Sequence, residues 1–256
     1  MELLMIGHLL GDFYFQTDGM AENKKKSLWY TLLHCFIYSV VMYIVLVIGT
    51  GQFHEYIFVA LLSGTLHLCV DGMKCALHKV RKLEKYQLLV FLLDQSIHVV
   101  LLFVVAYIYT INIDISWLPG ISESVINGIY GCLVIVCAFL FCGKPASVIV
   151  SRVFDMIPKT IQEAQGNGDD NAESEKAEEV KIGSWIGILE REIMLILGLM
   201  GEYGAIGFVI AAKSLARHKQ FDTPAFAEKY LIGTLLSSLM ALMCIVVYSG
   251  YRIFYM

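Results

Sequence analysis

Pairs of histidine and aspartate, four residues apart, recur in the apolar stretches of this sequence. The pairs are His8 with Asp12, His67 with Asp71, and Asp94 with His98. In an α-helix, this spacing places both side chains on one face, about one turn apart. Imidazole nitrogens and carboxylate oxygens are ligands that proteins use for zinc, iron and manganese. Each pair can therefore contribute ligands to a metal site.

Depth along the helices tests whether these groups can share an ion, because ligands on different helices must lie at similar heights. We count about 1.5 Å of rise per residue from the nearest basic loop. On this scale, four groups fall within roughly 7–14 Å of one surface: Asp12, His34, His67 and Asp94. His8 and His98 lie one turn deeper. We predict a site for one or two ions whose ligand candidates are His8, Asp12, His34, His67, Asp71, Asp94 and His98.

A short internal repeat supports this site. The sequence HLLGD at residues 8–12 is echoed by HLCVD at residues 67–71. The partner positions follow at matching distances, since His34 comes 26 residues after the first histidine and Asp94 comes 27 after the second. Two helical hairpins that face each other across a shared polar core would produce this pattern. Gln16 extends the first stripe by another turn and could orient a ligand.

The alternative interpretation is that these residues are hydrogen-bonded pairs that fix helix packing, as polar side chains do between membrane helices. Inserting one charged side chain at a helix centre costs roughly 2.5–3.5 kcal/mol. Seven ionisable groups at matching depth would therefore be an expensive way to obtain packing alone. The pattern favours a divalent transition metal, with zinc as the first choice and iron or manganese as the alternatives.

The composition indicates that the surrounding elements are membrane helices. Hydrophobic residues make up 57% of the 256 residues and charged residues 16%, whereas a soluble domain carries roughly a quarter charged residues. Stretches that are long enough or nearly long enough to cross a bilayer are 28–49, 54–71, 86–111, 124–143 and 229–254. Shorter apolar stretches that carry charges, and so are short or re-entrant, are 2–16, 184–200 and 203–217. The predicted fold is an all-α, polytopic transmembrane helical bundle of about eight segments.

The distribution of charge predicts the topology and the domains. Lys and Arg gather near residues 24–26, 74–85, 144–159 and 217–219, and are missing from 50–53, 112–123 and 201–204. Because basic loops are retained in the cytoplasm, the N-terminus is predicted to lie outside. Residues 160–182 are acidic and polar, which is typical of a cytoplasmic linker, between membrane halves at 1–159 and 183–256. The net charge of −4 and the lack of a basic face argue against a nucleic-acid partner.

The second half also carries ionisable residues within apolar sequence. Glu190 could be a further ligand or a general base, while Arg191 and Lys213 could hold an anionic substrate group such as phosphate or carboxylate. The alternative is that these residues pair with one another and so allow a helical hairpin to insert. The turn of that hairpin is predicted at residues 201–204.

Two motifs carry a resemblance to a known family. The first reads H-L-L-G-D-F-x-x-Q at residues 8–16, and the second is E-R at 190–191 followed by A-I-G-F-x-x-A-A-K-S at 205–214. With these motifs, the sequence resembles, over nearly its full length, a bacterial integral-membrane family classed as a domain of unknown function. The resemblance implies a location in the bacterial cytoplasmic membrane. The first half is more distantly similar to inner-membrane proteins described as metal-dependent hydrolases, which also carry His and Asp in short apolar helices.

The leading functional hypothesis is a metal-dependent hydrolase that acts on a membrane lipid or another amphiphilic small molecule near the cytoplasmic leaflet. The bound ion would activate water, and Asp94 or Glu190 would move protons. One alternative is a metal-ion or proton-coupled transporter, because intramembrane His and Asp residues also form proton relays. Another is a non-catalytic membrane sensor or scaffold. The nearly continuous Val, Leu, Ile and Phe in the outer halves of the second to fourth segments favours a site that opens to one side only.

Overall fold

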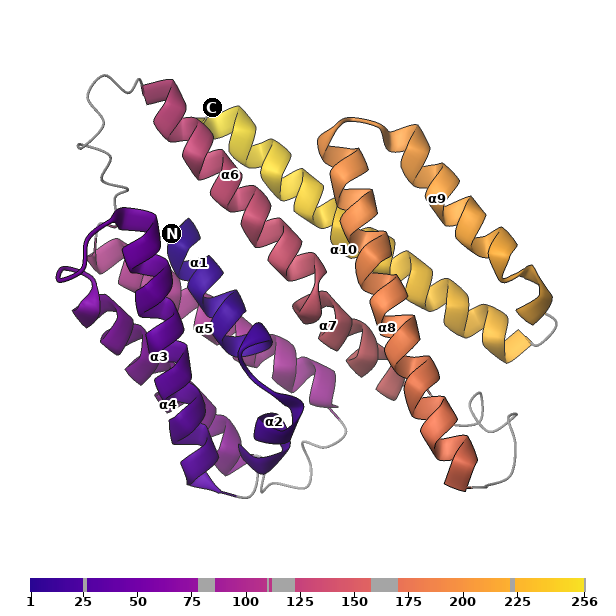
Figure 1. Cartoon of the computed structure of the whole chain (residues 1–256), viewed down its shortest axis with the longest axis horizontal. Helices are drawn as coiled ribbons and strands as arrows, with labels where there is room; N and C mark the ends of the chain where they lie inside the picture. The colour runs from indigo at the N-terminus through magenta and orange to yellow at the C-terminus, as the bar shows by residue number, and fades with distance from the viewer. Residues whose placement is uncertain are drawn as a thin grey trace. The chain divides into compact units, whose positions relative to one another are not determined.

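The computed structural model of this chain is built from α-helices, with no strand among the residues that it describes: 1–24, 27–77, 86–109, 111, 123–157, 170–221 and 224–255. It divides into two compact units, residues 1–140 and 141–255, which are coloured along the chain in Figure 1. Each unit is described by itself below. The predicted all-α helical bundle is confirmed.

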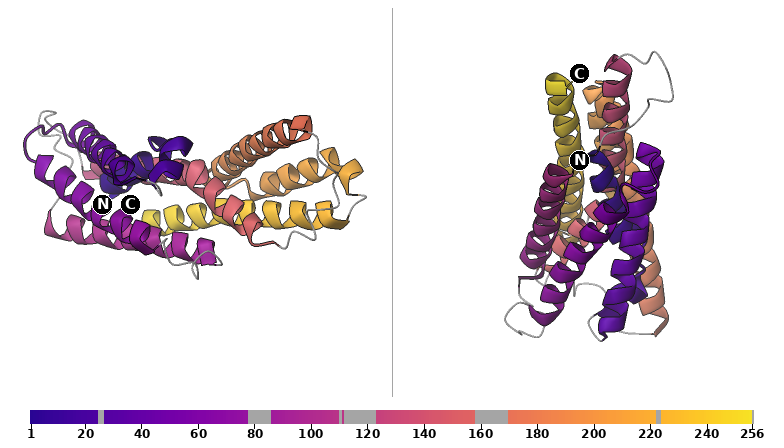
Figure 2. Two further views of the ribbon diagram at one scale, coloured as in Figure 1. Left: turned by 90° about the horizontal axis from the view of Figure 1, so that it is seen from below. Right: turned by 90° about the vertical axis from the view of Figure 1, so that its left-hand side faces the viewer.

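The first unit is a helical bundle built around α3 and α4. Its helices are α1 (Glu2–Leu9), the π-helix η1 (Leu10–Tyr14), α2 (Asp18–Lys24), α3 (Leu28–Thr50), α4 (Ile57–Leu77), α5 (Gln87–Ile108) and most of α6 (Glu123–Cys142). α4 packs against both α3 and α5, and α1 also contacts α3 and α5, so these four helices enclose a common interior (Figure 2). The four predicted metal-binding segments therefore share one bundle.

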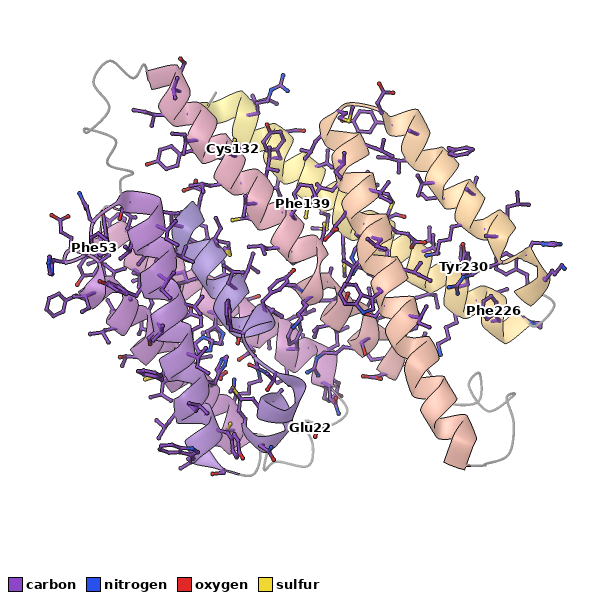
Figure 3. The ribbon with its side chains drawn as sticks, in the orientation of Figure 1. Glu22, Phe53, Cys132, Phe139, Phe226 and Tyr230 are labelled. Atoms are coloured by element: carbon purple, nitrogen blue, oxygen red, sulfur yellow. The ribbon has the colours of Figure 1, made fainter. Side chains whose placement is uncertain are left out.

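The second unit contains the remaining helices. They are α7 (Lys144–Asp155), α8 (Asp170–Leu199), α9 (Tyr203–Ala216), the 3₁₀ turn η4 (His218–Gln220) and α10 (Pro224–Tyr255). α8 packs against α7, α9 and α10. The predicted hairpin of α8 and α9 is present, and Gly201 in its turn has a φ of 81°, which glycine adopts without steric cost. At the start of α10, Phe226 and Tyr230 stack on each other (Figure 3).

The surface of α3 is typical of a helix surrounded by lipid. Ser27 begins the helix by accepting a hydrogen bond from Trp29 N, and Gly51 ends it with a φ of 73°. The exposed large side chains along α3 are apolar and include Trp29, Leu32, Phe36, Val40, Ile44 and Ile48. Its buried side chains include polar residues such as Thr31, His34 and Tyr38. Apolar side chains outside and polar ones inside reverse the arrangement of a soluble protein.

Five helices are long and apolar enough to cross a membrane, counted over the described residues. They cover Leu28–Thr50, Ile57–Ala76, Gln87–Ile108, Ser124–Asp155 and Phe226–Ile253. These helices coincide with the five long predicted spans, and they identify the chain as a helical membrane protein.

Three features differ from the sequence-based expectation. The short helix α2 was not predicted, and α7 follows α6 after a break at Gly143, where Pro145 lies in the first turn of the new helix. Of the predicted linker, residues 160–169 lie outside the described part of the chain, while α8 already begins at Asp170. Ala, Glu and Lys are good helix formers, so a polar composition does not prevent residues 170–182 from extending the apolar helix.

The interior of the first unit has an apolar end and a polar end. The apolar core gathers near the connection between α3 and α4, and its fully buried members include Leu4, Met42, Leu46 and Val59. Figure 3 labels Phe53 in this connection and Glu22 on α2, at opposite ends of the unit. The predicted ligands lie between the apolar core and the α2 end, on the inward faces of α1, α3, α4 and α5.

Close packing of α3 on α4 depends on Gly64. A Cβ at this position would overlap Ser39 Oγ and lie 3.0 Å from Ser39 Cβ, whereas a Cβ at Gly72, later in the same helix, would meet no atom within 4 Å. We expect Gly64→Ala to lower the melting temperature, because overpacking costs about 1–3 kcal/mol. Gly72→Ala should leave it unchanged or raise it slightly, because alanine favours a helix by about 0.5–1 kcal/mol over glycine. Circular dichroism during heating in detergent measures both, and an equal response of the two variants would contradict this packing.

Candidate metal centre

The predicted ligands of the first half are buried together in the first unit. His8 and Asp12 come from α1 and η1, His34 from α3, His67 and Asp71 from α4, and Asp94 and His98 from α5. The histidines, Asp71 and Asp94 are each no more than 5% exposed, and the Asp12 side chain is 10% exposed. The structure therefore brings all seven candidates into one interior, although they do not play equivalent parts in it.

Three atoms from three elements converge on one point. His34 Nε2 and His67 Nε2 lie 3.0 Å apart. Asp12 Oδ1 lies 3.2 Å from His34 Nε2 and 3.6 Å from His67 Nε2. Zinc bonds of about 2.0–2.1 Å in tetrahedral geometry place neighbouring ligand atoms about 3.3–3.4 Å apart. The triangle formed by these atoms thus has the dimensions of one face of a tetrahedral zinc site.

The π-helix η1 turns Asp12 toward this point. Phe15 N donates to Leu10 O at 2.9 Å, five residues earlier, so the turn that contains Asp12 holds one residue more than an α-helical turn. In a regular α-helix, Asp12 would share a face with His8. Here Asp12 faces His34 and His67, while His8 contacts a different set of partners. π-Helical turns occur frequently at functional sites.

Asp71 lies beside the three converging atoms. Its Oδ2 is 3.9 Å from His34 Nε2 and 3.8 Å from His67 Nε2, farther than Asp12 Oδ1 is from either nitrogen. The same oxygen accepts a hydrogen bond of 2.7 Å from Lys24 Nζ. Lys24 also donates to Gln16 Oε1 at 2.9 Å. Asp71 is therefore placed next to the fourth position of a three-ligand site, and Lys24 holds it there.

His8 supports the centre through hydrogen bonds. Its Nε2 donates to Gln95 Oε1 at 3.3 Å, because that oxygen can only accept. Its Nδ1 then accepts from Tyr38 Oη, also at 3.3 Å. Gln95 Nε2 in turn donates to Asp12 Oδ2 at 2.9 Å. With both ring nitrogens bonded to protein groups, His8 orients Asp12 through Gln95, and in this arrangement it has no lone pair left for an ion.

Asp94 and His98 form a second polar group one helix away. Asp94 Oδ2 accepts from Lys74 Nζ at 2.6 Å, and its Oδ1 is buried without a hydrogen-bond partner among the described residues. His98 Nδ1 donates to the Asp94 carbonyl oxygen at 2.9 Å, which leaves Nε2 as the nitrogen that carries a lone pair. Asp71, Asp94 and His98 also offer ligand atoms within 4.8 Å of one another. A second ion would be held by this group.

A small cavity adjoins the centre on the side of the apolar core. It has a volume of about 10 Å³ and is lined by Tyr38, Ser63, His67 and His98 together with leucine and valine side chains. Ser63 Oγ, His67 Nδ1 and His98 Nε2 are buried and have no hydrogen-bond partner within the described ranges. A volume of this size corresponds to about one water-sized sphere. The Tyr38 ring, which stacks on His67 at 4.0 Å between centroids, forms the wall between the cavity and α3.

The charges of the cluster do not balance. Three carboxylates, those of Asp12, Asp71 and Asp94, face two ammonium groups, those of Lys24 and Lys74. With neutral imidazoles, one negative charge is left in excess in a bundle interior, where isolated charges are costly. A divalent cation at the converging atoms would offset this charge, so the donor set and its electrostatics both suit a metal ion.

The predicted site residues of the second half lie in the second unit and contact their own neighbours. Lys213 Nζ pairs with Glu190 Oε2 across the α8–α9 hairpin. Arg191 is 1% exposed, and its guanidinium donates to the carbonyl oxygens of Cys142 and Gly143 and to the hydroxyls of Ser147 and Ser237. These contacts correspond to the alternative interpretation, in which the charges pair inside the hairpin region. The proposed roles in catalysis and substrate binding stay predictions.

Four residues of the centre were missed by the sequence-based reasoning. They are Lys24, Tyr38, Lys74 and Gln95. Tyr38 follows His34 by four residues, which is the same spacing that singled out the His and Asp pairs. Gln95 is adjacent to Asp94, and the two lysines were assigned to solvated basic loops. Long lysine side chains at helix ends can reach back into a bundle, and sequence spacing alone does not reveal this.

Comparison with known proteins gives a family without a function. A family model described as "Protein of unknown function (DUF3307)" matches residues 1–123. Neither a curated protein nor a solved structure matches the chain. The predicted resemblance to an uncharacterised family is confirmed over this range, while the motifs at residues 190–191 and 205–214 lie outside it. Residues 1–123, which hold the whole candidate metal centre, are thus the part of the chain that matches the DUF3307 family of unknown function.

Proposed function

We propose that the first unit binds a divalent transition metal ion, zinc in the first instance, and uses it to hydrolyse a lipid or amphiphilic substrate. The observation that carries this proposal is the convergence of Asp12 Oδ1, His34 Nε2 and His67 Nε2 at mutual distances of 3.0–3.6 Å. Two histidines and one carboxylate, with the fourth position left to water, is the ligand set of catalytic zinc in several hydrolases. A structural zinc site would instead be closed by four protein ligands.

The groups around the three ligands suit hydrolysis. The ion supplies a nucleophilic hydroxide near neutral pH and polarises the bond that is cleaved. Asp71 Oδ2, at 3.8–3.9 Å from the two histidine nitrogens, can accept a proton from a water molecule in the fourth position. We therefore assign the general base to Asp71, in place of the Asp94 or Glu190 suggested by sequence alone. Asp94 is occupied by Lys74.

The position of the centre supports access from one side of the membrane. Lys24 and Lys74 lie in the last turns of α2 and α4, at the basic ends of these helices. Basic ends are retained on the cytoplasmic side, so we place the centre near the cytoplasmic leaflet of the bacterial inner membrane, with the N-terminus outside. A transporter would need a polar route to the opposite surface. The apolar core around Met42, Leu46 and Val59 fills that end of the bundle and favours a hydrolase.

Metal analysis of the full-length chain, purified in detergent without chelators, tests the proposal. We expect about one zinc ion per chain by inductively coupled plasma mass spectrometry. Removing it with a chelator should lower the melting temperature, because a ligand that binds only the folded state stabilises it, and adding zinc should restore it. Hydrolysis of a chromogenic ester or phosphate in mixed micelles should follow the zinc content.

Two outcomes would contradict the proposal in different ways. A chain that contains no metal and whose melting temperature does not respond to zinc, iron or manganese would eliminate the metal centre. A chain that binds zinc, lacks zinc-dependent hydrolysis and moves zinc or protons across proteoliposomes would replace the hydrolase by the transporter.

A further inference from the structure

Two lysines mark the substrate group that this centre accepts. Resting on the proposed metal-dependent hydrolase, we propose that the substrate is a phosphate ester whose phosphoryl oxygens are held between the metal ion and the ammonium groups of Lys24 and Lys74. The sequence had suggested Arg191 and Lys213 for an anionic group. Both of these have protein partners within the second unit, whereas Lys24 and Lys74 contact the centre itself.

Each lysine is fixed at the edge of the centre by one of its carboxylates. Lys24 Nζ lies 2.7 Å from Asp71 Oδ2, and Lys74 Nζ lies 2.6 Å from Asp94 Oδ2. The side chain of Lys24 is 11% exposed and that of Lys74 is 33% exposed, so the pair lies between the buried ligands and the surface of the unit. A substrate that enters at the basic end of the bundle passes these two ammonium groups.

The lysines retain hydrogen-bond donors for a ligand. An ammonium group has three N–H donors. Lys24 uses two of them, for Asp71 and Gln16, and Lys74 uses one, for Asp94, among the described residues. A phosphoryl group carries several acceptor oxygens, enough to contact the ion and both lysines at once. Lysine is a common phosphate ligand in proteins.

The charge of the loaded centre also selects an anion. The protein groups carry one excess negative charge, so a divalent ion changes the total to one excess positive charge. A neutral carboxylic ester would leave that positive charge uncompensated in the bundle, at the cost that accompanies an unpaired buried charge. A phosphate monoester or diester brings the negative charge that is missing. Electrostatics thus favours phosphate esters over neutral lipids.

The hydrolysis step balances without any further reactant. The oxygen of one water molecule forms the new bond to phosphorus, and the bond between phosphorus and the alcohol oxygen breaks. The proton released by water goes to the carboxylate of Asp71, which returns it to the departing alcohol oxygen. Lys24 and Lys74 hold the charge that develops on the phosphoryl oxygens. The products are the free alcohol and phosphate, or a phosphate monoester if the substrate was a diester.

Isothermal titration calorimetry with inorganic phosphate tests the proposal on the full-length, zinc-loaded chain. Lys24→Gln and Lys74→Gln should each weaken phosphate binding by about tenfold or more, because each removes a charge-assisted hydrogen bond. Zinc binding to the same variants, measured first and without phosphate, should be unchanged or tighter, since each substitution releases a carboxylate from its ammonium partner. Lys219→Gln, which removes an exposed lysine of the second unit, is the matched control and should change neither affinity.

The outcomes separate this inference from the function on which it rests. Failure of the unsubstituted chain to bind zinc would remove the proposed function itself. Zinc binding with phosphate affinities that are equal in the unsubstituted chain and both lysine variants would overturn the phosphate assignment and leave the metal centre intact. Turnover of a water-soluble phosphate monoester and of phosphatidic acid in phosphatidylcholine nanodiscs then identifies the source of the phosphate. Cleavage of neutral esters only would also overturn the inference.

Discussion

His67→Ala is expected to abolish zinc binding, with an affinity loss of more than about a hundredfold, because groups that only orient a ligand already account for 10- to 100-fold. His67 Nε2 is one corner of the ligand triangle and lies 3.0 Å from His34 Nε2. The substitution also removes the ring on which Tyr38 stacks. Zinc content and zinc-dependent turnover should both disappear, as measured by elemental analysis and by the chromogenic assay. His67→Gln, which retains much of the side-chain volume, separates loss of the ligand from loss of folding.

Two further histidines provide the comparison for this experiment. His54 is exposed in the same unit, and His54→Ala should retain the zinc of the unsubstituted chain. His98 lies outside the ligand triangle, so His98→Ala should bind zinc more weakly without losing it. If His98→Ala lost its metal while His67→Gln retained it, the ion would belong to the group of Asp71, Asp94 and His98.

Arg191→Met is expected to destabilise the second unit strongly. The guanidinium donates 2.6 Å hydrogen bonds to the Cys142 carbonyl oxygen and to Ser147 Oγ, where the helix breaks between α6 and α7. A buried acceptor that loses its donor costs about 1–3 kcal/mol, and Arg191 serves several acceptors at once. We expect a loss of about 2–4 kcal/mol in the free energy of unfolding, observed as a lower melting temperature and a lower yield of monodisperse protein in detergent.

The control for this variant is Arg252→Met, which removes an exposed arginine from α10 of the same unit and should leave stability unchanged. Arg191→Lys should recover part of the stability, because an ammonium can reach some of the same oxygens but cannot present the planar guanidinium. A folded Arg191→Met variant with unchanged melting temperature and weakened substrate binding would instead establish the binding role first suggested by sequence.

Much of the fold follows from quantities that a sequence states directly. The five long helices were predictable because each contains enough consecutive apolar residues to cross a bilayer. Convergence of Asp12, His34 and His67 was predictable because helix rise fixes depth from residue number alone. Depth says which groups share a height, and the structure places these three within 3.6 Å of one another.

The division of roles among the seven candidates was not predictable, because it depends on the rotation of each helix about its own axis. His8 and Asp12 have the same spacing as His67 and Asp71, yet His8 bonds to Tyr38 and Gln95 and does not join the ligand triangle. The partners of Lys24 and Lys74 depend on how far flexible side chains reach. The pairing of Glu190 with Lys213 was foreseen only as an alternative, since a buried ion pair and a substrate-binding pair require the same residue types.

The single extra residue in the turn of η1 acts as a rotation device. Each residue advances an α-helix by about 100° around its axis, so a turn with one residue fewer would point Asp12 away from the two histidines by roughly that angle. A bundle of perfectly regular helices could bring His34 and His67 together but would leave the third corner of the triangle unfilled. The hydrogen bond from Phe15 N to Leu10 O, entirely within the backbone, thereby sets the number of ligands that the side chains can offer.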